Sequence, residues 1–124
     1  MNRVALLVMV LAVPAAAQTE LAPAAPPPGW VARNGATLVA LDKVLARATP
    51  IEASVGETVH FSTLAITVRA CMVRPPDQAP DATAFLDIVS APDGPSFHGW
   101  QIVSAPAVAG FEHPTLDVRL VGCR

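Results

Sequence analysis

The stretch LAITVRACMV, residues 64–73, gives the clearest indication of the fold. Every second residue from Leu64 to Met72 is apolar, and this period of two is typical of a β-strand with one face toward a core. On this count Arg69 and Cys71 lie on the opposite, more polar face. The stretch is too short and too rich in β-branched residues to favour a helix.

Shorter segments of the same character lie on both sides of this stretch. Gly, Pro, Asn and Asp separate them, and no long helical period occurs. Pro50 places its segment at a sheet edge or a bulge. We therefore predict a mainly β fold, a small antiparallel sandwich or barrel of about six to eight short strands. The predicted strands cover residues 36–41, 46–55, 58–61, 64–73, 82–90, 99–104 and 115–122.

Cys71 and Cys123 are the only two cysteines in the chain. An even count in an exported protein favours a disulfide, which here closes a loop of about 50 residues and stabilises by roughly 4 kcal/mol in the chain-entropy account. Asp117 and Arg119 alternate with apolar residues on the same face of the last strand as Cys123. If the two cysteine-bearing strands are neighbours, Arg69 lies beside Asp117.

The N-terminal segment has the features of an export signal. Within residues 1–17, Arg3 precedes the apolar run Val4–Val13, and a small-residue cleavage pattern follows. That run is shorter than the ~20 residues a transmembrane helix needs. We predict that residues 1–17 are a cleaved signal peptide, 18–29 a Pro/Ala-rich flexible tether, and 30–124 a single β-domain. The mature chain is then periplasmic, with no transmembrane segment.

The charge of the predicted mature chain is modest and negative. Removing Arg3 leaves one basic residue fewer than the eight of the whole chain, against ten acidic ones, for a formal charge of −3. No basic patch or stripe occurs, which argues against nucleic acid or anionic lipid as the partner.

No arrangement of residues predicts catalysis. No serine lies in a nucleophile elbow, both cysteines are expected in a disulfide, and no cofactor motif is present. His98, His113 and Glu112 are metal-ligand types, but their spacing matches no zinc pattern. We predict no metal and expect the two histidines to hydrogen-bond loop backbone. The alternative is a metal-binding protein or hydrolase using these three residues.

Aromatic residues concentrate around one connection, FHGWQIVSAPAVAGFEHP at 97–114. Phe97 and Phe111 are expected in the core. Trp100 is a candidate contact for a partner, because tryptophan is rarely fully buried and is enriched at binding hot spots. The predicted partner-binding residues are Trp100, His98, Arg74 and Arg119.

Several blocks of the sequence resemble one family, the proteobacterial domain of unknown function 2155, a group of small exported proteins. The resemblance covers about three quarters of the chain, and RACMVRPP (69–76) and FHGW (97–100) are its most specific parts. It implies a periplasmic address and a two-cysteine domain, and it implies no activity. Arg119 departs from the family pattern, which has an aromatic there, so that position is expected to face solvent or a partner. The other blocks are LDKV (41–44), VGETVHFSTLAITV (55–68), TAFLDI (83–88), SAPAVAGFEHP (104–114) and the terminal GC (122–123).

Together these features predict an exported, non-catalytic binding or accessory module for another envelope protein. A more specific variant is an accessory subunit docked on the outer face of an inner-membrane assembly such as a respiratory complex.

Overall fold

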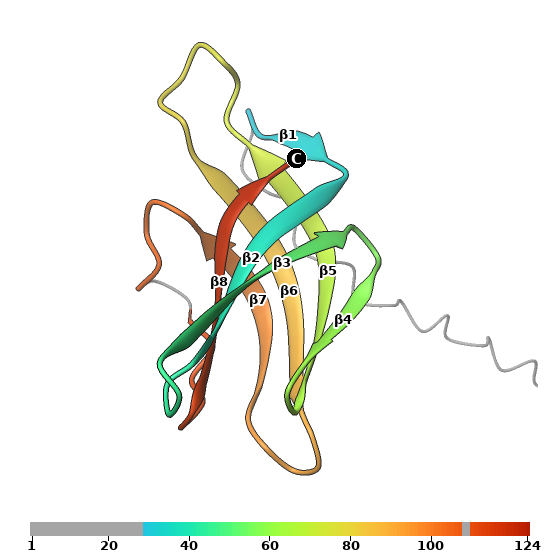
Figure 1. Cartoon of the computed structure of the whole chain (residues 1–124). Coiled ribbons are helices and arrows are strands. Elements are labelled where there is room, and N and C mark those ends of the chain that lie inside the picture. The colour runs from blue at the N-terminus through green and yellow to red at the C-terminus, as the bar shows by residue number, and fades with distance from the viewer. Residues whose placement is uncertain (1–28, 108–109) are drawn as a thin grey trace, which may run out of the picture.

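The computed structural model describes residues 29–107 and 110–124, and these form eight strands in two antiparallel sheets that face each other (Figure 1). The predicted signal peptide and residues 18–28 of the predicted tether lie outside the described residues. The described part of the chain contains no helix. The strands are β1 (Val31–Arg33), β2 (Gly35–Asp42), β3 (Arg47–Ser54), β4 (Thr58–Phe61), β5 (Leu64–Val73), β6 (Ala82–Ser90), β7 (Ser96–Ile102) and β8 (Leu116–Cys123).

One sheet, here called sheet A, has the strand order β1-β5-β6-β7. The ten-residue strand β5 is long enough to pair with two short strands along one edge: β4 pairs with residues 64–67 and β1 with residues 71–73. The second sheet, sheet B, has the order β3-β2-β8. The chain passes from sheet B to sheet A at the β3–β4 turn, where the Gly56 amide donates to the Val68 carbonyl oxygen.

The mainly β prediction is confirmed, including the position of Pro50. This proline lies on β3, an edge strand that pairs only with β2, and edge strands are where proline is tolerated in a sheet. The strand predicted at 99–104 was misplaced. Pairing with β6 begins as soon as the Pro-rich turn ends, at Ser96 opposite Val89, and the strand ends at Ile102.

The core lies between the two sheets and is almost entirely aliphatic. Phe111 enters it from the loop before β8, and Phe97 of β7 packs against it, as the sequence predicts. The largest fully buried side chains are Leu38, Leu64, Ile66, Leu86, Ile88, Val68, Val118 and Cys71. Because these come from β2, β5, β6 and β8, each sheet contributes its inner face to one shared core.

The predicted Cys71–Cys123 disulfide is present, with a Cα–Cα distance of 5.7 Å. It joins β5 of sheet A to β8 of sheet B. The prediction that both cysteines lie on the polar faces of their strands was wrong. In β5, Val68 and Ala70 oppose consecutive residues of β6, so Arg69 is an additional residue in a β-bulge. The bulge reverses the alternation, and Cys71 faces the core at 1% exposure.

A second bulge turns Cys123 in the same way. Leu38 of β2 lies opposite Leu120, whereas the preceding Thr37 lies opposite Gly122, so Val121 is the additional residue of β8. Cys123 therefore shares the inner face with Ala36, although Leu120 also points inward. Each strand needs its bulge for its cysteine to reach the other sheet.

The expected proximity of Arg69 and Asp117 was also wrong. β5 and β8 lie in different sheets, so these two residues are not cross-strand neighbours. Arg69 instead donates to Asp87 on β6, and Asp117 accepts from Arg119 on its own strand.

Candidate functional site

The outer face of sheet A carries an apolar cluster. Residues directly opposite each other in antiparallel strands share a face, so the register aligns Phe85 with both Ala70 and Trp100. Their neighbours in β6, Ala84 and Leu86, are fully buried on the inner side. Phe85 and Trp100 therefore point away from the core. The outer-face cluster consists of Ala70, Met72, Phe85, Trp100 and Ile102, with the buried Thr83 aligned between Met72 and Ile102.

Phe85 and Trp100 form the centre of this cluster. Their ring centroids lie 5.4 Å apart with an interplanar angle of 85°, an edge-to-face contact. Both side chains are half-buried, although nothing from sheet B covers them. The sheet thus presents a rigid aromatic pair on its solvent side, while aliphatic residues fill the core.

Charged residues continue this face toward the start of β5. Asp87 lies opposite His98, whose Nδ1 donates to Oδ1 at 2.8 Å, and Arg69 Nε donates to Oδ2. Partial burial would raise the pKa of Asp87, but the hydrogen bonds and charges of His98 and Arg69 outweigh it and lower that pKa below its ordinary value. The carboxylate is therefore ionised and satisfied by its neighbours. His98 and Arg69 keep 56% and 54% of their side chains exposed.

Arg74, directly after β5, lies against Trp30. Its guanidinium carbon is 4.1 Å from the centroid of the Trp30 ring, the geometry of a cation–π contact. Trp30 is half-buried, and its Nε1 has no hydrogen-bond partner within the described residues. The stacking fixes Arg74 at the end of sheet A where β1 pairs with β5.

Arg119 lies on the other sheet. It is exposed on β8, and its Nε donates to Asp117 Oδ2 at 2.8 Å. Of the four predicted partner-binding residues, the structure brings Trp100 and His98 together on the outer face of β7. Arg74 follows β5 of the same sheet, which β6 separates from β7, and Arg119 does not join them. Sequence reasoning missed Phe85, Asp87 and Arg69, although the outward positions of strand 82–90 hold the first two.

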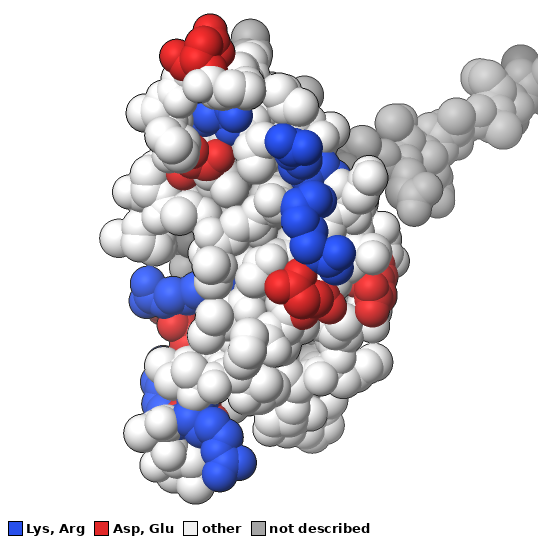
Figure 2. All heavy atoms as spheres, turned by 45° about the horizontal axis from the view of Figure 1, so that its top comes forward, with Lys and Arg blue, Asp and Glu red and all other residues white. Residues whose placement is uncertain are grey.

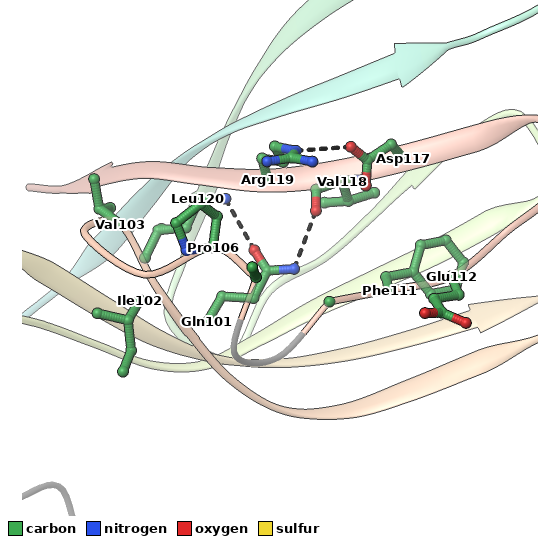
Figure 3. Close-up of a pocket in the computed structure, with 12 residues that line it drawn as sticks. Gln101, Ile102, Val103, Pro106, Phe111, Glu112, Asp117, Val118, Arg119 and Leu120 are labelled. Atoms are coloured by element: carbon green, nitrogen blue, oxygen red, sulfur yellow. Dashed lines mark hydrogen bonds and ion pairs between the residues drawn. The ribbon is translucent and has the colours of Figure 1, made fainter.

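A cleft of about 390 Å³ lies where β7 and β8 approach each other (Figure 3). Gln101 of β7 reaches across to the free edge of β8: Nε2 donates to the Val118 carbonyl oxygen, and Oε1 accepts from the Leu120 amide, both at 3.0 Å. The amide group thus takes the place of a neighbouring strand. Because these edge groups are already paired, the cleft offers little backbone for another strand to join.

Glu112 and His113 lie in the loop before β8. His113 Nδ1 accepts from the amides of Thr115 and Leu116, each at 3.1 Å, so its proton is on Nε2, which donates to Ser90 Oγ at 3.3 Å. The expected backbone contact is confirmed for His113. For His98 it was wrong, because the partner there is the Asp87 carboxylate.

The residues of the metal alternative do not meet. His98 lies with Asp87 on the outer face of sheet A, whereas His113 contacts Ser90 and the start of β8, and Glu112 is exposed. Within residues 29–107 and 110–124, no group of three potential metal ligands is found. No helix in that part of the chain has the length and apolarity needed to cross a membrane.

Fold and surface together define a small antiparallel β-sandwich, fastened by one inter-sheet disulfide, with an aromatic and charged patch on one outer face. Residues 36–123 match the family described as "Uncharacterized protein conserved in bacteria (DUF2155)", and the chain belongs to that family. The resemblance noted in the sequence is thereby confirmed. Neither the curated proteins nor the solved structures contain a match to the chain.

Proposed function

We propose that this protein is a non-catalytic binding or accessory module that acts in the periplasm on another envelope protein. The observation that carries the proposal is the Phe85–Trp100 pair on the outer face of sheet A, next to the Arg69–Asp87–His98 cluster. Large aromatic residues and arginine are enriched among the few residues that dominate the affinity of protein interfaces. We name these five residues the sheet A patch.

The patch is already ordered before any partner arrives. Its residues lie on the paired strands β5, β6 and β7, and the aromatic pair and the ion pairs hold their side chains. Binding would therefore cost little conformational entropy, which favours a stable protein contact over a transient one. An apolar aromatic centre with charged residues beside it is consistent with the composition of such interfaces.

The periplasmic part of the proposal rests on two observations. The inter-sheet disulfide is typical of oxidising compartments. The N-terminal 17 residues have the charge and apolar pattern of an export signal, and the Pro/Ala-rich residues 18–29 suit a tether. A partner on the outer face of an inner-membrane assembly is the specific variant we favour.

Affinity capture after mild cross-linking of envelope membranes tests this proposal. Tagged wild type is compared with Trp100→Ala and with Val89→Glu, which adds a charge to an exposed position of the same sheet face without touching the aromatic pair. Val121→Ala on β8 is the matched control, because Val121 is equally exposed but lies on sheet B. Thermal unfolding of each variant separates lost binding from lost folding.

We expect one membrane complex to be captured by wild type and Val121→Ala, and at least tenfold less by Trp100→Ala and Val89→Glu. Free monomer from every variant would refute an accessory role. Undiminished capture by a folded Val89→Glu variant would place the interface away from the sheet A patch.

A further inference from the structure

The β2–β3 turn holds two large apolar side chains out in solvent. Val44 and Leu45 are 73% and 65% exposed, the two highest values among large apolar residues of the described chain. Scattered apolar residues on a surface are common, but here two are adjacent at the tip of a hairpin that projects from one end of the sandwich (Figure 1). Neither belongs to the core cluster or to the partly buried apolar residues that pack against it.

Three of the four backbone amides in the turn 43–46 donate hydrogen bonds within the protein. Asp42 Oδ1 accepts from the amides of Val44 and Leu45, both at 2.9 Å, and the Lys43 amide donates to the Thr115 carbonyl oxygen at 2.8 Å. Three consecutive N–H groups are thus paired inside the protein. These pairings lower the number of unpaired donors at the tip, whose desolvation would otherwise oppose insertion into an apolar phase.

Two cations flank the apolar pair. Lys43 precedes it and Arg47 follows it, and both are exposed. Lys43 Nζ donates to the His113 carbonyl oxygen at 2.9 Å, which holds the ammonium beside the tip and uses one of its three donors. Figure 2 shows basic side chains at the lower end of the molecule, where the turn lies in Figure 1, and a longer run of them in its upper part. Asp42 lies beneath the turn, and its Oδ1 accepts from two amides. Two further carboxylates, Glu112 and Asp117, line the same hollow as Lys43.

We propose that this hairpin tip docks on a phospholipid bilayer, with Val44 and Leu45 entering the headgroup–acyl boundary and Lys43 and Arg47 contacting lipid phosphates. The tip is convex, aliphatic and without a directional hydrogen-bonding group, which suits a deformable apolar phase better than a shaped protein pocket. The inference rests on the proposed function in one respect, since the chain must reach an envelope membrane.

The net charge of −2 over the whole chain does not attract an acidic surface. Binding must therefore come mainly from apolar insertion, and the two flanking cations should add a preference for anionic headgroups that salt weakens. The sequence contains no basic stripe, which argued against anionic lipid as the partner. The two cations at the turn are a local exception to that argument, and their contribution is secondary to apolar insertion.

Vesicle co-sedimentation of the protein purified from a periplasmic extract tests the inference, with vesicles of phosphatidylglycerol and phosphatidylethanolamine or of phosphatidylcholine alone. The variants are Val44→Ser/Leu45→Ser and Arg47→Glu. Their matched controls are Val121→Ser on β8 and Arg33→Glu on β1, exposed residues of the same types outside the β2–β3 turn. All variants have the same N-terminus, so differences in their vesicle partition come from the substituted residues.

We expect the double serine variant to lose roughly tenfold or more of the wild-type partition coefficient. Arg47→Glu should lose several-fold on phosphatidylglycerol vesicles at low salt, and the controls should match wild type. Equal partition of wild type and the double variant, or no partition of wild type, would overturn the inference. Affinity capture with the double serine variant then tests the proposed function independently of lipid binding. If this variant still captures the complex, the proposed function stands without the lipid contact. If capture also fails, the tip is a protein contact.

Discussion

Cys71 on β5 and Cys123 on β8 join the two sheets of the sandwich, and each faces its partner only because a β-bulge precedes it in its own strand. The bulge residues are Arg69 and Val121, both exposed. Bulges and disulfide are therefore one structural device: without the first, the regular alternation of a strand would point the sulfur atoms away from the core.

Removing the disulfide should destabilise the domain strongly. The bond joins residues that are 52 positions apart in the chain. Its loss in Cys71→Ala/Cys123→Ala should therefore lower the unfolding free energy by about 3–4 kcal/mol. Urea unfolding followed by circular dichroism measures this. Reductant should shift the wild-type midpoint toward that of the variant and leave the variant itself unchanged. A reductant effect on the variant would point to another cause.

Gln101 should be essential for closing the sandwich at the β8 edge. It is 6% exposed, and its amide satisfies both the Val118 carbonyl and the Leu120 N–H. Gln101→Leu keeps the volume but leaves two buried backbone groups unpaired, so it should cost about 2–4 kcal/mol. Chemical denaturation measures the loss.

Gln78→Leu is the matched control, because Gln78 is exposed in the loop between β5 and β6. It should change the unfolding free energy by no more than about 0.5 kcal/mol. If both leucine variants were equally stable, the Gln101 bridge would not contribute to closing the edge.

The strands could be predicted from the local alternation of apolar residues. Which side chains point toward the core could be predicted only for part of each bulged strand. Leu64, Ile66 and Val68 point inward as their alternation indicates. Beyond Arg69 the alternation fails, because one additional residue in a bulge inverts every later side chain and carries no signal in a single sequence.

The candidate site was predictable to a similar degree. Trp100 and His98 lie two residues apart on one strand, so their shared face follows from sequence spacing. Asp87 and Phe85 come from another strand, and only the register of β6 against β7 brings them opposite. Arg119 was grouped with them because it stands where the family pattern has an aromatic residue, and the sheet order separates it from them.

Acid should destabilise the domain through Asp81 and Asp87. Burial raises the pKa of both carboxyl groups, but other interactions outweigh it. For Asp81 these are hydrogen bonds from Ser104 and Ala82 and the charge of Arg74. For Asp87 they are the hydrogen bonds and charges of His98 and Arg69. Both pKa values lie below the ordinary 3.8. A lowered folded-state pKa adds stability above about pH 4, and that contribution disappears as the pH falls through the folded value.

Unfolding free energy measured from pH 6 to pH 2 should therefore fall for wild type below about pH 4. Asp87→Asn should be less stable at neutral pH and should lose less on acidification. An Asp87→Asn variant whose acid limb matched that of wild type would show that this carboxylate does not contribute to it.

Gly94 should not tolerate a side chain. A Cβ at this position would lie 2.6 Å from Ser90 Oγ and 2.7 Å from Ser90 Cβ, and Ser90 in turn contacts Thr63 and His113. Gly94→Ala must therefore displace the end of β6, at a cost of about 1–3 kcal/mol. Gly122→Ala is the matched control, because no atom lies within 4 Å of its added Cβ and it should be neutral to within about 0.5 kcal/mol. Thermal unfolding compares the two, and equal melting temperatures would contradict the close packing of the β6–β7 turn against Ser90.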